Sequence, residues 1–197
     1  MTEQGRTFGQ WAALGALSGT LATLVIFIPQ WLKFYDALEG NIHAGRMVIS
    51  FSPLSIAPGL IFGVILGYAL RRRGMAPGGR YAAYILAAAL SYFVTVQMTI
   101  NILLEMLDNA VLVGIAAGAI GAALLAGATA ALIPNFRHGL PALAMILAGA
   151  ILGALLFFAI SSEHFIGWLL LFAPWQTGYA AAMATALKYE GKGALAG

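Results

Sequence analysis

The chain has 197 residues, of which 61% are hydrophobic and only 9% are charged. Soluble globular domains carry roughly 25% charged residues, so this composition excludes a domain that faces water on every side. The sequence contains no cysteine, which excludes disulfides, thiolate metal sites and thiol catalysis.

The charged residues leave six long gaps without any charge, each of 24 to 28 residues. A membrane-spanning helix needs about 20 mostly apolar residues. We therefore predict an all-α fold, a polytopic integral membrane protein whose residues 1–197 form a single transmembrane domain. The six predicted transmembrane helices lie at about 11–32, 47–70, 81–104, 110–133, 140–161 and 165–187.

Positively charged loops are retained on the cytoplasmic side of a membrane, and the loop 71–80 carries four arginines. With this loop inside, the inner side holds eight Lys and Arg residues and the outer side holds Lys33 and Arg46. We therefore expect an integral protein of a cell membrane, the cytoplasmic membrane, with both termini in the cytoplasm. The apolar part of the first span is too long for a cleaved signal peptide.

The outer segment 31–46 is the longest predicted loop. Its aromatic and leucine residues fall on one helical face, which is typical of a short amphipathic helix in the membrane interface. An ordinary aromatic belt at the end of a helix is the alternative. The second span then contains Pro53 and Pro58, which interrupt helical hydrogen bonding. Ser52 and Ser55 could satisfy the freed groups, either beside a solute or in a simple proline kink.

Glycines recur at four-residue spacing in four of the spans, which allows close helix packing. They are Gly15 and Gly19; Gly59, Gly63 and Gly67; Gly114 and Gly118; and Gly149 and Gly153.

The third span is the most polar. Gln97, Asn101, Glu105 and Asp108 follow one another at spacings of 4, 4 and 3, which keeps them on one helical face. Ser91, Thr95 and Thr99 form a second line on a different face. The first line predicts either a polar path that opens outward, with acids attracting a cationic solute, or interhelical hydrogen bonds and a solvated loop.

The later spans repeat some features of the earlier ones. Short similar segments end the first and fourth spans and occur within the second and fifth, which suggests a 3+3 inverted repeat of the kind found in transporters. In the sixth span, Gln176 and Thr177 follow Pro174 near mid-membrane and are further binding candidates. Glu163 joins Glu105 and Asp108 as an acid at the outer mouth.

These features favour a small-solute permease, or the membrane-embedded substrate-binding subunit of a transporter. The predicted substrate-binding residues are Gln97, Asn101, Gln176, Thr177, Ser52 and Ser55, and the outer-mouth acids are Glu105, Asp108 and Glu163. We expect no catalytic residue, no metal and no cofactor.

The competing hypothesis is a non-catalytic assembly or accessory subunit that meets a membrane-protein partner, or a second copy of itself, through its glycine faces. A third hypothesis is an intramembrane enzyme that acts at the outer leaflet. The expected partners are the lipid bilayer and such membrane proteins, and not nucleic acid.

Overall fold

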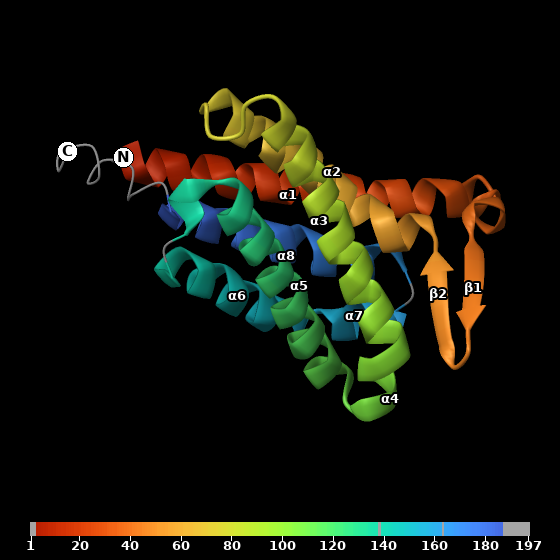
Figure 1. Cartoon of the computed structure of the whole chain (residues 1–197). Coiled ribbons are helices and arrows are strands. Elements are labelled where there is room, and N and C mark those ends of the chain that lie inside the picture. Colours follow the sequence, from red (N-terminus) through yellow and green to blue (C-terminus); the bar gives the residue numbers. More distant parts are fainter. Residues whose placement is uncertain (1–2, 138, 163, 187–197) are drawn as a thin grey trace.

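A computed structural model describes residues 3–137, 139–162 and 164–186, and it is helical over 82% of the chain. The helices and short helical turns are α1 (Glu3–Trp31), η1 (Tyr35–Leu38), α2 (Pro53–Arg72), α3 (Gly79–Met98), η2 (Thr99–Leu103), α4 (Leu104–Met106), α5 (Ala110–Leu132), η3 (Pro134–Phe136), α6 (Gly139–Gly153), α7 (Leu156–Ser162) and α8 (Phe165–Ala186). Two strands, β1 (Gly40–Ala44) and β2 (Met47–Phe51), form the remaining regular structure. Figure 1 shows the helices as one bundle with the strands at one end.

Five helical segments are long and apolar enough to cross a membrane. They are Thr7–Trp31, Pro53–Arg72, Gly79–Met106, Ala110–Leu132 and Gly139–Ser162. The all-helical class predicted from the charge gaps is thus confirmed, and these five segments are compatible with insertion into a membrane. The sixth predicted span corresponds to α8, which has 22 residues. It is not among these five segments, and its middle carries Trp175, Gln176 and Thr177 next to Pro174.

Glycines bring three pairs of helices into close contact, as their spacing predicts. On α1, an added Cβ at Gly15 or Gly19 would collide with the α8 backbone. Gly59 and Gly63 of α2 lie against α3. The glycines of α5 and α6 face each other, since Gly118 lies against the Gly149 carbonyl. The pairs α1–α8, α2–α3 and α5–α6 are the closest-packed in the described chain.

The segment before α2 differs from the prediction. Instead of an amphipathic helix over 31–46, the chain forms the short turn η1 and then an antiparallel hairpin that pairs Ala44 with Met47 and Gly40 with Phe51. Gly45 has a φ of 64°, which suits the first residue of a two-residue hairpin turn. Rings instead gather at helix ends, where Phe165 lies 5.6 Å from Phe27 and 5.5 Å from Trp31 between centroids.

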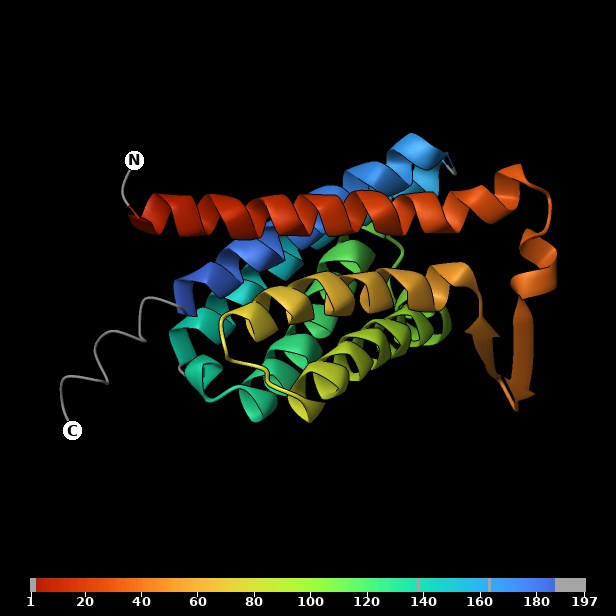
Figure 2. The same cartoon turned by 90° about the horizontal axis from the view of Figure 1, so that it is seen from above.

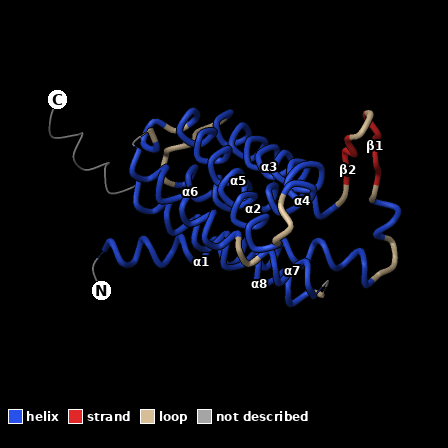
Figure 3. The backbone as a smooth tube through the Cα atoms, turned by 90° about the horizontal axis from the view of Figure 1, so that it is seen from below, coloured by secondary structure: helices blue, strands red, loops and turns tan. Residues whose placement is uncertain are grey.

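The hairpin also shortens the second predicted span, because residues 47–51 are strand and α2 begins only at Pro53. Figure 2 shows the hairpin beyond the end of the helices, with β1 farther from the bundle than β2, and Figure 3 shows the same arrangement from the opposite side. We call this the hairpin end.

The opposite end carries the arginine loop and is the more densely packed one. Here the guanidinium of Arg73 lies 5.6 Å from the ring of Trp11 and that of Arg71 lies 5.5 Å from the ring of Tyr81. The larger core cluster, which includes Leu70, Tyr84 and Tyr179, fills this end. A smaller cluster around Phe172 lies toward the hairpin end.

Candidate functional site

Gln97 and Asn101, the predicted solute-binding amides of α3 and η2, contact the hairpin. The Gln97 Oε1 accepts a hydrogen bond from the Ser50 N–H (3.0 Å), and its Nε2 donates to the Ser50 carbonyl (2.8 Å). Asn101 Oδ1 accepts from the Val48 N–H (2.7 Å), and its Nδ2 donates to the Val48 carbonyl (2.9 Å). Each side-chain amide therefore pairs with the N–H and the C=O of one residue of β2, as a residue of a neighbouring antiparallel strand would. We call these two pairs the amide clamp.

The spacing of the clamp follows from elementary geometry. In an antiparallel ladder, alternate residues direct their N–H and C=O groups to opposite edges of a strand. Val48 and Ser50 direct theirs away from β1 and toward α3. Two residues of a strand advance about 6.8 Å, and four residues of a helix advance about 6.0 Å. The side-chain amides of residues four apart on a helix can thus reach alternate residues of a strand.

A π-helical turn lies at the same place. In η2 the N–H of Leu104 donates to the carbonyl of Thr99, five residues earlier, and Asn101 is inside this turn. Such π-helical turns are rare and are often found at functional sites.

The predicted sites Ser52 and Ser55 cap α2. The Ser52 side chain accepts from the Ser55 N–H, and the Ser55 side chain accepts from the Ser52 N–H, which is a reciprocal capping box. Pro53 is the first residue of the helix, where its missing N–H breaks no hydrogen bond. The expectation that Pro53 interrupts a span is therefore wrong, while Pro58 does lie inside α2. Nearby, burial raises the pKa of Tyr35 above its usual value.

Replacing Ser52 with alanine should lower the free energy of unfolding by about 1 kcal/mol, because an N-cap hydroxyl is lost. Urea or SDS titration of the purified protein measures the change. Ser162→Ala is the matched control, since its hydroxyl donates only to the Phe158 carbonyl of its own helix. Equal stability of both variants would contradict the capping role.

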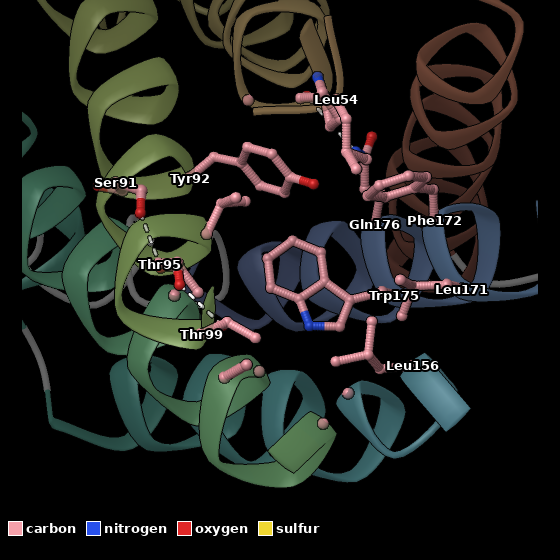
Figure 4. Close-up of a pocket in the computed structure, with 18 of the residues that line it drawn as sticks. Leu54, Ser91, Tyr92, Thr95, Thr99, Leu156, Leu171, Phe172, Trp175 and Gln176 are labelled. Atoms are coloured by element: carbon pink, nitrogen blue, oxygen red, sulfur yellow. Dashed lines mark hydrogen bonds between the residues drawn. The ribbon is translucent and has the colours of Figure 1, made fainter. Parts of the chain in front are cut away.

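A cavity of about 210 Å³ lies in the bundle, between α3 and α8 and nearer the hairpin end. Figure 4 shows Ser91, Thr95 and Thr99 along one side of it and Trp175 and Leu156 on the other. The second polar line of the third span thus faces the interior, and the clamp residues face the hairpin. The described chain does not place Gln97 or Asn101 in the cavity wall.

The cavity wall is almost entirely apolar, and several of its polar groups have local partners. The Thr95 hydroxyl donates to the Ser91 carbonyl (2.7 Å) and the Thr99 hydroxyl to the Thr95 carbonyl (2.8 Å). The indole N–H of Trp175 donates to the Gly149 carbonyl (3.1 Å). The aromatic rings of Phe62, Tyr92, Trp168 and Phe172 provide much of the remaining surface.

The predicted sites on α8 separate into two roles. Gln176 belongs to the cavity wall and is 2% exposed. Its Nε2 lies 3.5 Å from the Pro58 carbonyl, and its Oε1 has no hydrogen-bond partner in the described chain. Thr177 is outside the cavity, and its hydroxyl donates to the Ala173 carbonyl (2.6 Å) of its own helix. Of the two, only Gln176 is in a position to meet a bound molecule.

The predicted outer-mouth acids Glu105 and Asp108 are exposed at the hairpin end, in and just after α4. The third one, Glu163, lies outside the described residues. Among the residues that the structure describes, no three His, Asp or Glu side chains lie together in a group that could hold a metal ion.

Sequence reasoning missed the aromatic part of the cavity wall. Trp168, Phe172 and Trp175 occur at spacings of 4 and 3 along α8, which places them on one helical face. That pattern was available in the sequence, but the same spacing is typical of an ordinary packed helix face. They line a cavity only because α3 and α8 lie apart at this level. No local sequence pattern reports the distance between two helices.

No family model, curated protein or solved structure matches this chain. The fold and the site define a helical bundle with five helices long and apolar enough to span a membrane and with an apolar cavity between its helices. Its function is therefore argued from the site alone.

Proposed function

We propose that the protein is a small-solute permease, or the membrane-embedded binding subunit of a transporter, and that it binds its ligand in the cavity between α3 and α8. The observation that carries this proposal is the cavity itself, about 210 Å³ in volume. Ligand sites between the helices of a bundle are common, and they are mostly apolar with few polar groups. Among the described groups of this wall, Gln176 offers a buried acceptor without a hydrogen-bond partner.

We propose six membrane spans for this function, with α8 as the sixth. The start of α1, the arginine loop and the end of α8 all lie at the end of the bundle away from the hairpin (Figure 1). An even number of crossings accounts for this arrangement. The excess of Lys and Arg supports a cytoplasmic location of that end in the cytoplasmic membrane.

We also propose a 3+3 inverted repeat, with α1, α2 and α3 related to α5, α6 and α8. The helix contacts support it, because each contact in one half has a counterpart in the other. The contact α1–α2 corresponds to α5–α6, and the contact α2–α3 corresponds to α6–α8. The contact α1–α8 corresponds to α5–α3, and all six contacts occur. Inverted repeats with a binding site between the halves are a frequent transporter architecture.

The accessory-subunit hypothesis loses part of its basis. It relied on glycine faces that are free to meet another protein, but these faces pack against helices of the same chain. Gly15 lies against Gln176, Gly59 against Ala88 and Tyr92, and Gly114 against Gly153.

Replacing Ala117 with phenylalanine should abolish ligand binding, because Ala117 lines the cavity and a phenyl ring would fill much of it. The probe is 1-aminoanthracene, an apolar fluorophore, titrated into the protein in nanodiscs. We expect saturable binding to the native protein and at least about a tenfold loss of affinity in Ala117→Phe, equivalent to about 1.4 kcal/mol.

Leu124→Phe is the control, since Leu124 is on the same helix but is 40% exposed on the outer surface of the bundle. If 1-aminoanthracene partitions without saturation, and to the same extent in the native protein, Ala117→Phe and Leu124→Phe, the proposal is refuted. Flux of the bound compound in proteoliposomes then separates a permease from a binding subunit.

A further inference from the structure

The cavity wall includes exposed side chains at the hairpin end, and we infer that the cavity opens to the surface there. Three of its lining residues are exposed, namely Ile100 (41%), Leu104 (48%) and Ile160 (39%). They come from η2, α4 and α7, at the hairpin end. We call the opening between them the mouth.

The elements that form the mouth carry further exposed apolar side chains. Exposed residues on the same elements and on the first turn of α5 are Ile102 (38%), Met106 (73%), Leu112 (51%), Phe157 (43%) and Phe158 (47%). A surface of this kind faces hydrocarbon in a membrane-spanning protein. The acids Glu105 and Asp108 follow Leu104 in the chain and mark the water boundary, because charged groups avoid the hydrocarbon core. The mouth therefore lies beside this boundary, next to the outermost part of the lipid chains in the leaflet at the hairpin end.

The wall chemistry disfavours water and polar solutes. A buried water needs two to four polar partners, whereas the donors of Thr95, Thr99 and Trp175 are already bonded to backbone carbonyls. The Gln176 Oε1 is a single buried acceptor without a partner at the described wall, which is too few for a water. Apolar cavities of about 150 Å³ remain dry and bind benzene. This one is larger, about 210 Å³, and therefore accommodates a segment of hydrocarbon chain.

The aromatic side chains of Trp168 and Phe172, both on α8, line the cavity. Phe172 is only 3% exposed, and the Trp168 and Phe172 rings stack with centroids 5.7 Å apart. Figure 4 shows Phe172 and Trp175 on the α8 side of the cavity, opposite Tyr92 and Thr95 of α3. A chain that enters at Ile100 and Ile160 would lie between these two sides.

We propose that the ligand is the hydrocarbon chain of an amphiphile from the leaflet at the hairpin end, which enters sideways through the mouth while its polar end remains at the membrane surface. This inference rests on the proposed function, because it names the ligand of the same cavity.

The test is photolabelling in nanodiscs with a phosphatidylcholine that carries a diazirine on one acyl chain, with adducts mapped to individual residues. Phe172 and Trp175 are diagnostic, since bulk lipid reaches outward residues such as Leu170 but not the cavity wall. We expect adducts on both, reduced several-fold in Ala117→Phe and in Ile160→Trp and unchanged in Leu124→Phe. Ile160→Trp changes a surface position, so it narrows the mouth without altering the packed interior.

A second arm uses a diazirine-bearing benzene that has no chain. If this small probe labels Phe172 and the lipid probe does not, the cavity binds free apolar molecules and the inference about lipid chains is overturned while the proposed function stands. If neither probe labels the wall, both proposals fail. Equal lipid labelling of Phe172 in all variants would also overturn the inference, because labelling would then not depend on the cavity.

Discussion

The variant Gly118→Ala should unfold at markedly lower denaturant than the native protein, with a loss of about 2–3 kcal/mol in the free energy of unfolding. A Cβ at residue 118 would overlap the carbonyl oxygen of Gly149 and approach the Cα of Gly153 to 2.9 Å. These are backbone atoms, so no side chain can rotate to make room. The two helices must separate, and the backbone contact that holds α5 on α6 is lost.

The matched control is Gly127→Ala on the same helix. An added Cβ there meets nothing within 4 Å, so the substitution should be neutral or stabilise the protein by about 0.4–1 kcal/mol through the unfolded state. Unfolding in mixed micelles, followed by tryptophan fluorescence, compares the two variants. Similar denaturation midpoints for Gly118→Ala and Gly127→Ala would show that α5 and α6 are less closely packed than described.

The variant Asn101→Leu should release the hairpin from the bundle. Leucine leaves the N–H and C=O of Val48 without their partner, and an unsatisfied peptide group that is partly buried costs about 1–3 kcal/mol. Hydrogen exchange of the Val48 amide should accelerate about tenfold or more, the equivalent of about 1.4 kcal/mol. Gln97→Leu should do the same at Ser50.

Thr99→Val controls for a change within the same helical turn, since the Thr99 hydroxyl donates only to its own helix, at the Thr95 carbonyl. Exchange at Val48 should be unaltered in this variant. Unchanged exchange in Asn101→Leu would mean that water replaces the amide at no cost, and that the clamp contributes nothing to hairpin stability.

The long helices and their glycine contacts could be predicted from the sequence, because both depend on local patterns. Charge gaps report the length of apolar segments, and glycine spacing reports a flat helix face. The hairpin was missed although its signals are local too. Residues 47–51 are uncharged, so they extend the apolar gap, while Ser52 and Pro53 together mark the start of a helix.

The site was predicted only in part, for a different reason. The four-residue spacing of Gln97 and Asn101 indicated a shared face, but their partners Ser50 and Val48 lie 47 and 53 residues away in the chain. Nothing local distinguishes a strand edge from a solute as the partner of an amide. The cavity could not be predicted at all, because it depends on where two helices fail to meet.

The π-helical turn η2 belongs to two structures at once. Its residues Thr99 and Ile100 form cavity wall, and its residue Asn101 holds β2. Any occupant that shifts this turn changes the free energy of hairpin opening, and hairpin opening changes the affinity for that occupant by the same factor, since coupling between two sites is reciprocal. The free energy of hairpin opening and the affinity of the cavity are therefore linked through the five residues of η2.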